Sequence, residues 1–101
     1  PDLPIEQRLS TLAENLGKFK QSFVLISSKP ATHPSGVAAG ELRYTHVTQG
    51  VPLTDRELIL WLAPGKTLFV TGSAVTSLWP KYEAGLNIIL DSVTAQKQGR
   101  L

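Results

Sequence analysis

Two acidic residues, Asp55 and Glu57, come nearest in this chain to a pair that could do acid–base chemistry. They stand two positions apart in a segment that predicts a strand, so both side chains point to one face and Arg56 points to the other. A carboxylate pair on one face can transfer protons or bind calcium. At the exposed start of a strand such a pair is more commonly solvated charge. A small hydrolase, which would have to join Asp55, Glu57 and a histidine, is therefore the least favoured function class.

The histidines add little support for metal binding or catalysis. His33 lies in a predicted loop between Thr32 and Pro34, and we expect it to be solvated, while His46 lies in a predicted strand. The chain contains no Walker loop, dinucleotide-binding glycine motif or GxSxG segment. It also has no cysteine, which excludes disulfides, thiolate metal ligands and a cysteine nucleophile. We expect no enzymatic activity, no metal and no cofactor.

Length and charge define the remaining function classes. The chain has 101 residues with ten Lys and Arg against eight Asp and Glu, a formal net charge of +2. This predicts one domain over residues 1–96, followed by a polar tail over residues 97–101. No basic stripe is present to neutralise a phosphate backbone, so nucleic acid is not an expected partner. No apolar run is long enough to span a membrane directly.

The segment 57–72, ELILWLAPGKTLFVTG, predicts two apolar strands joined by a turn at Pro64-Gly65. Alternation separates its side chains into two faces. One face is purely aliphatic and is expected to be core; it contains Leu58, Leu60, Leu62, Leu68 and Val70. The other face mixes apolar residues with threonine; it contains Ile59, Trp61, Phe69, Thr67 and Thr71.

Two further strands are predicted before this hairpin, over residues 21–29 and 40–49. The short turn at Gly50-Val51-Pro52 favours antiparallel pairing, because a parallel crossover needs about a dozen residues. Amphipathic helices are expected at both ends of the chain. The first helix has its apolar stripe at Ile5, Leu9, Leu12, Leu16 and Phe19, with Glu6, Gln7, Arg8, Glu14 and Asn15 on the opposite face. The second has its stripe at Tyr82, Leu86, Ile89, Leu90 and Val93, with Glu83 and Asn87 on the wet side.

These elements predict an α+β fold, an antiparallel meander of about four strands with both helices packed on its aliphatic face. The mixed face would then stay open, with Ile59, Trp61 and Phe69 as an apolar groove. Its expected polar rim consists of Thr67, Thr71, Arg43, Thr45 and Glu57. Such a groove suits a peptide or helix with an apolar surface. Burial of the same residues by a missing segment or by a dimer mate is the alternative.

The order of these segments resembles the DcrB-like family of bacterial domains, whose fold is related to the Mog and PsbP proteins. The resemblance runs through LPIEQRLSTLAENL, GELRYTHVTQGVPLTDRELILWLAPGKTLFVTGSA and YEAGLNIILDSV, and covers nearly the whole chain. The positions that match the family pattern are Tyr44, Gly50, Arg56, Gly65, Thr71 and the run Asp91-Ser92-Val93. These are patterns of residue type and include no catalytic residue.

The resemblance implies a function. The Eag branch of the family is similar to a set of cytoplasmic, dimeric chaperones that bind transmembrane segments of type VI secretion effectors on the open sheet face. We therefore expect a non-catalytic chaperone or adaptor that works as a homodimer and binds an apolar effector helix. Another branch consists of envelope lipoproteins, so an envelope or periplasmic domain with an undefined binding role is the alternative.

The start of the chain departs from the family pattern. Members of the family begin with a β-hairpin ahead of the first helix, and this hairpin is absent here. The chain begins at Pro1 and contains no methionine. We interpret it as a fragment whose sheet edge favours pairing with another chain. An export signal further upstream is compatible with this interpretation, and it would move the protein from the expected cytoplasm to the envelope.

Overall fold

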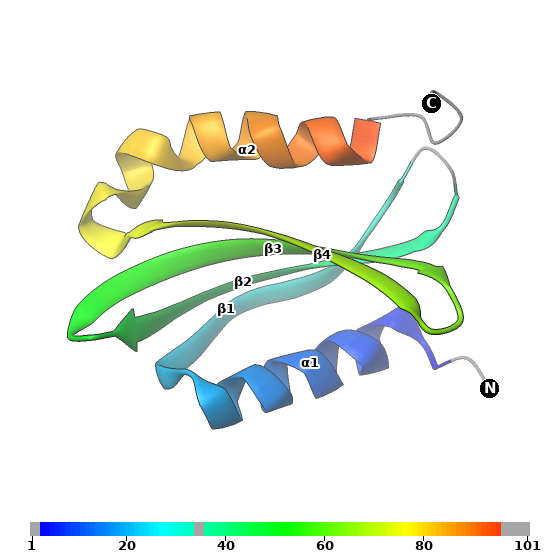
Figure 1. Cartoon of the computed structure of the whole chain (residues 1–101), viewed down its shortest axis with the longest axis horizontal. Coiled ribbons are helices and arrows are strands. Elements are labelled where there is room, and N and C mark those ends of the chain that lie inside the picture. Colours follow the sequence, from blue (N-terminus) through cyan, green and yellow to red (C-terminus); the bar gives the residue numbers. More distant parts are fainter. Residues whose placement is uncertain (1–2, 34–35, 96–101) are drawn as a thin grey trace.

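The computed structural model describes residues 3–33 and 36–95, apart from the side chains at positions 91 and 93–95. Its elements follow in the order α1 (Ile5–Phe19), β1 (Gln21–Ala31), β2 (Ala38–Thr48), β3 (Val51–Ala63), β4 (Lys66–Val75), a 3₁₀ turn (Thr76–Leu78) and α2 (Trp79–Ala95). Figure 1 shows the four strands as one sheet between the two helices. The predicted α+β fold is confirmed. The predicted tail over residues 97–101 lies outside the described residues.

The sheet is an antiparallel meander with strand order β1-β2-β3-β4. The pairing of β2 with β3 runs without a break from Ala38 opposite Trp61 to Thr48 opposite Val51. Tight turns make this order possible, because Gly50 and Gly65 adopt φ angles of 79° and 77° that favour glycine. Since consecutive strands are joined by such short turns, each lies antiparallel beside the next.

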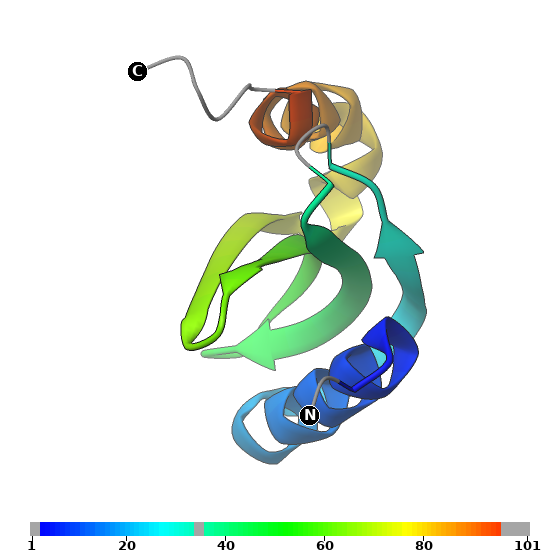
Figure 2. The same cartoon turned by 90° about the vertical axis from the view of Figure 1, so that its right-hand side faces the viewer.

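The helices lie on opposite faces of the sheet, which corrects the expectation that both pack on one face (Figure 1, Figure 2). On one face, Leu9 of α1 packs so closely over Gly40 that an added Cβ would come within 2.7 Å of the leucine side chain. On the other, a Cβ at Gly72 would lie 3.4 Å from both Leu86 and Leu90 of α2. Each helix therefore has a glycine in the strand beneath it.

The strand register identifies which side chains each helix covers. Gly40 is opposite Ile59, and Gly72 is opposite Arg56. Ile59 and Arg56 are three positions apart on β3, so their side chains point to opposite faces. We call the side with Ile59 the α1 face and the side with Arg56 the α2 face. Both faces of the β3–β4 hairpin contain buried apolar residues, and each face is covered by one helix. The face with Ile59, which was expected to stay open, is therefore partly covered by α1.

The main hydrophobic core lies between α1 and the α1 face. The buried residues of this cluster are Leu9, Ala13, Leu42, Tyr44 and Ile59, and Ile5, Leu12, Leu16, Phe23 and Trp61 pack against it partly buried. The stripe predicted for the first helix is thus the core-facing one as far as Leu16. Phe19, which was expected on the same side, is 86% exposed at the end of the helix.

Under α2 the predicted aliphatic core is only partly present. Leu58 and Leu60 are buried, whereas Leu62 and Leu68, toward the β3–β4 turn, are 44% and 41% exposed. The sheet-facing residues of α2 include Leu86 and Leu90. Tyr82 and Ile89, which the periodicity had placed in the core stripe, remain exposed. Within the described part of the chain, neither helix has the length and hydropathy needed to cross a membrane.

Candidate functional site

Part of the α1 face is left uncovered along β4. Helix α1 packs on β1 and β2, while β4 forms the far edge of the sheet. Thr67, Phe69 and Thr71 lie on the α1 face, since their register partners on β3 are Trp61, Ile59 and Glu57. All three are exposed, Phe69 by 48% of its surface. We call Trp61, Thr67, Phe69 and Thr71 the uncovered strip.

The predicted groove is therefore half core and half surface. Ile59 is fully buried beneath α1 and cannot contact a partner, so its assignment to the binding surface is wrong. Trp61 is half-buried and packs against the core. Phe69, on the same face, stays accessible because α1 ends its cover before reaching β4. The apolar contact residues that remain are Trp61 and Phe69.

Two residues of the predicted rim lie on the other side of the sheet. Arg43 is opposite Arg56 in the register, and Thr45 shares its face, so both belong to the α2 face. Arg43 is engaged there, because its Nε and Nη1 donate 3.1 Å hydrogen bonds to Glu41 Oε2 and Glu83 Oε2. The assignment of Arg43 and Thr45 to the rim of the groove is wrong. Along β2 these two positions alternate with the residues whose side chains lie on the same face as Ile59.

A buried polar network crosses the α1 face beyond the core. Ser73 Oγ donates a 2.7 Å hydrogen bond to Asp55 Oδ1, and Asp55 Oδ2 lies 3.1 Å from His46 Nε2. The other ring nitrogen, Nδ1, lies 3.3 Å from Thr48 Oγ1. Asp55 is 3% exposed, which contradicts the expectation of solvated charge. Both imidazole nitrogens face polar partners and the carboxylate lies between Ser73 and His46, unlike a nucleophilic triad, in which the imidazole takes the middle place.

Glu57 continues this network toward the core. It is 8% exposed and accepts a 2.8 Å hydrogen bond from the Tyr44 hydroxyl. Burial raises the pKa of Glu57, as does the charge of Asp55, and these outweigh the opposing effects of the Tyr44 hydrogen bond and the Lys20 charge. Burial and the adjacent Glu57 raise the pKa of Tyr44. The structure thus brings together Asp55, Glu57 and His46, the groups that the hydrolase alternative required, but buries them.

A second ionic network lies beneath α2. Arg56 Nη2 donates a 2.9 Å hydrogen bond to Glu41 Oε1, and Arg56 Nη1 donates a 3.0 Å bond to Asn87 Oδ1 of α2. Burial alone would raise the pKa of Glu41, but the Arg56 and Arg43 guanidiniums lower it below its ordinary value. Glu83 and Asn87, expected on the wet side of α2, point to the sheet instead. The buried Arg56 and the partly buried Arg43 require polar partners on the helix, and hydrophobic periodicity does not register such partners.

His33 is 7% exposed rather than solvated. Among the described residues, no group of three or more His, Asp or Glu side chains has an arrangement that could hold a metal ion.

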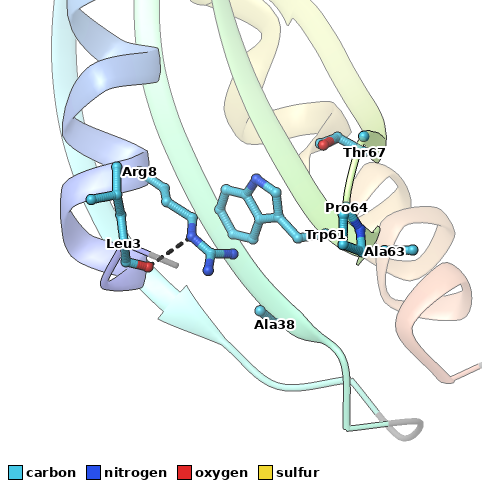
Figure 3. A pocket seen from close by; sticks show the side chains of 8 residues that line it. Leu3, Arg8, Ala38, Trp61, Ala63, Pro64 and Thr67 are labelled. Atoms are coloured by element: carbon cyan, nitrogen blue, oxygen red, sulfur yellow. Dashed lines mark hydrogen bonds between the residues drawn. The ribbon is translucent and has the colours of Figure 1, made fainter. Parts of the chain in front are cut away.

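A pocket of about 450 Å³ opens at the end of the uncovered strip, between the start of α1 and the β3–β4 turn. Figure 3 shows the Arg8 guanidinium directed toward the Trp61 ring across this pocket. The Arg8 Cζ atom lies 5.1 Å from the ring centroid, and its Nε donates a 2.8 Å hydrogen bond to the Leu3 carbonyl. The lining residues are Leu3, Arg8, Ala38, Trp61, Ala63, Pro64, Gly65 and Thr67.

Sequence reasoning missed Arg8, which was assigned to the polar face of the first helix. A signal for its true position was present. Arg8 stands three residues after Ile5 and four before Leu12, a spacing that places all three on adjoining parts of one helix face. Arg8 therefore flanks the apolar stripe, where its stem can lie along the core while the guanidinium reaches Trp61.

A second pocket, of about 460 Å³ and mostly apolar, lies between β4 and α2. It is lined by Ser73, Ala74, Val75, Leu78, Tyr82, Gly85, Leu86 and Ile89. Neither pocket is lined by Asp55, Glu57 or His46.

Comparison with known proteins gives a fold and no function. No family model matches the sequence, and a search of characterised proteins finds no match. The crystal structure of PA94 from Pseudomonas aeruginosa, a protein of unknown function described as a candidate regulator, is similar to this chain with a TM-score of 0.79. The two sequences are 21% identical, and the similarity covers 96% of this chain and 66% of PA94. This chain thus spans just under two thirds of PA94, and the similarity establishes the shared fold.

Proposed function

We propose that this chain is a non-catalytic chaperone or adaptor that binds an apolar, transmembrane-like helix of a type VI secretion effector. The observation that supports this most directly is Phe69, 48% exposed on the part of the α1 face that helix α1 leaves uncovered. An accessible aromatic ring beside a half-buried Trp61 and the hydroxyls of Thr67 and Thr71 offers an apolar helix both burial and hydrogen bonds. The effector as partner is taken from the resemblance to DcrB-like domains.

The energetics of the strip are adequate for such a partner. Burying one large apolar side chain contributes about 2 kcal/mol. Leu3, which is 47% exposed, lines the adjoining pocket and extends the apolar surface beyond Trp61. A helix lying along Phe69, Trp61 and Leu3 would bury the exposed parts of three such groups, each worth up to about half of that value. This supports a reversible contact that protects a transmembrane-like segment until it is handed over.

The homodimer remains part of the proposal. Both outer strands of the sheet have a neighbour on one side only, and β1 presents three exposed apolar side chains. Val24, Leu25 and Ile26 are 59%, 40% and 57% exposed. An apolar edge strand of this kind is suited to pairing with another chain. Sedimentation of the purified protein tests this: a monomer at all concentrations contradicts the dimer.

A cytoplasmic site of action and the lack of catalysis belong to the same proposal. The buried position of Asp55, Glu57 and His46 supports a structural role for these groups, because none of them exposes more than 8% of its surface to a substrate. An envelope lipoprotein domain is the alternative. It requires a signal peptide and a lipid-acceptor cysteine upstream in the gene.

The test uses Phe69, because Trp61 also packs against the core and its loss would affect folding. We would measure binding of a labelled apolar helical peptide of about 20 residues, the length of a membrane span, by fluorescence anisotropy. We expect Phe69→Ala to weaken binding by about fivefold, since a partner buries only the exposed half of the ring, worth about 1 kcal/mol. Val51→Ala removes an apolar side chain of similar exposure, 42%, at the β2–β3 turn and is the control.

The outcomes are distinct. Loss of binding in Phe69→Ala with wild-type affinity in Val51→Ala supports the strip as the docking surface. Equal affinities of wild type and Phe69→Ala contradict it. Absence of peptide binding to the wild-type protein contradicts the chaperone function itself.

A further inference from the structure

The guanidinium of Arg8 is held in place through its Nε atom and by its contact with the Trp61 ring. Its Nε is bonded to the Leu3 carbonyl and its plane lies over Trp61. Across residues 3–33 and 36–95, no side chain or carbonyl makes a hydrogen bond or ion pair with its Nη1 and Nη2 groups. These groups present donors in a fixed fork. Arg8 lines the pocket of about 450 Å³, which is large enough for a ligand group.

The lining of the pocket limits the charge of that ligand. Among the described residues that line it, Arg8 is the one ionisable side chain and none is acidic. A guanidinium fork matches the two oxygens of a carboxylate in a bidentate pair. A phosphate dianion carries more charge than one arginine offsets. A singly charged carboxylate is the better match.

The remaining walls define what carries the carboxylate. Leu3, Ala38 and Pro64 are apolar, and the Trp61 ring forms another wall (Figure 3). The Thr67 hydroxyl is the polar side chain on the hairpin side. Trp61 and Thr67 belong to the uncovered strip as well, so the pocket continues the proposed docking surface. A group bound here would be attached to the apolar segment that lies on the strip.

We infer that the Arg8 pocket binds a carboxylate carried on an apolar segment, and that this carboxylate is an Asp or Glu side chain of the bound helix. The inference rests on the proposed function and deepens it, because it assigns the partner an acidic residue at one end of its apolar stretch. Arg8 would select such partners over purely apolar helices and set the direction in which they lie along the strip.

The experiment compares two apolar helical peptides that differ in one terminal-turn residue, Glu or Gln. Wild-type protein should bind the Glu peptide about tenfold more tightly, the effect of one charge-assisted hydrogen-bonded pair. The indole N–H resonance of Trp61 should shift more with the Glu peptide. Arg8→Gln should bind both peptides with the affinity that wild type has for the Gln peptide. Lys18→Gln, which removes an exposed cation from the same helix, should keep the tenfold preference.

The result separates this inference from the function on which it rests. If wild type binds both peptides equally well, the carboxylate site is overturned and the docking strip stands. If neither peptide binds, both are overturned. A free acid, 3-phenylpropionate, is compared with its amide as a third arm. A shift of the Trp61 indole with the acid, together with no preference for the Glu peptide, would show a small-molecule site and overturn the assignment to a partner helix.

Discussion

Glu41 and Arg56 form a hydrogen-bonded ion pair across β2 and β3, with 2.9 Å between Oε1 and Nη2 and side-chain exposures of 5% and 10%. The pair lies beneath α2, where Arg56 is also bonded to Asn87. Two charges withdrawn from water are tolerable only when each satisfies the other. The packing of α2 on the sheet therefore depends on both Glu41 and Arg56.

Glu41→Gln should destabilise the protein by roughly 3 kcal/mol at neutral pH, because it leaves the buried Arg56 charge uncompensated. Urea unfolding at pH 7 measures this. Glu14→Gln, an exposed change on α1, should stay within about 0.5 kcal/mol of wild type. Since the pKa of Glu41 is lowered from 4.5, its contribution is present above pH 4.5 and is lost as the pH falls through the folded-state pKa. If the variant were destabilised relative to wild type by the same amount at pH 7 and at a pH below the folded-state pKa of Glu41, this account would be contradicted.

Glu57→Gln should act in the opposite direction. The raised pKa of Glu57 means that its stabilising contribution is fully present below its ordinary value of 4.5 and is lost as the pH rises through the folded-state pKa. A glutamine carbonyl can still accept the Tyr44 hydrogen bond without a buried charge. We expect the variant to gain stability relative to wild type as the pH rises from 4 to 8. Urea unfolding of both proteins across this range measures the difference. A loss of stability of the variant relative to wild type between pH 4 and 8 would contradict this interpretation.

Gly40→Ala and Gly85→Ala should have effects of opposite sign. At Gly40 a Cβ meets the Leu9 side chain at 2.7 Å, so the variant should lose about 1–3 kcal/mol through overpacking beneath α1. At Gly85, within α2, the added carbon meets no atom within 4 Å beyond its chain neighbours and the helix's own backbone, and alanine should gain up to about 1 kcal/mol from helix propensity. Thermal midpoints measured side by side check the pair. A stable Gly40→Ala would mean that α1 packs elsewhere.

Ile59→Ala and Phe69→Ala test the division of the α1 face into core and surface. Ile59 is fully buried and its truncation should cost about 2–5 kcal/mol. Phe69 is directly opposite in the register but half exposed, so its truncation should cost clearly less. Chemical denaturation gives both values. Similar losses for the two variants would place Phe69 in the core and remove the uncovered strip.

Much of the fold could be predicted because it depends on local patterns. Alternation along residues 57–72 and the turns at Gly50 and Gly65 predict the β2–β3–β4 meander, since strand period and turn chemistry act over a few residues. The stripe of Ile5, Leu9, Leu12 and Leu16 likewise predicts α1 and its core side.

The candidate site was predicted less well. Phe69, Thr67 and Thr71 are where the sequence pattern placed them, on one accessible face of β4. Ile59 shares their face yet is buried, because it packs into the core cluster with Leu9 of α1, whereas the helix, which lies on β1 and β2, stops short of β4. Which part of an apolar face a helix covers depends on its docking, and alternation along a strand contains no information on that.

What the sequence by itself determined are the elements, their order and the two-faced character of each strand, all of which follow from the chemistry of neighbouring residues. Only the tertiary structure decided that the helices take opposite faces, that Glu41 pairs with Arg56, that Asp55 meets His46, and that Arg8 lies over Trp61. These pairs join residues distant in the chain, and their contact depends on register and helix docking together. The surface that remains accessible, and with it the proposed function, is decided at this level.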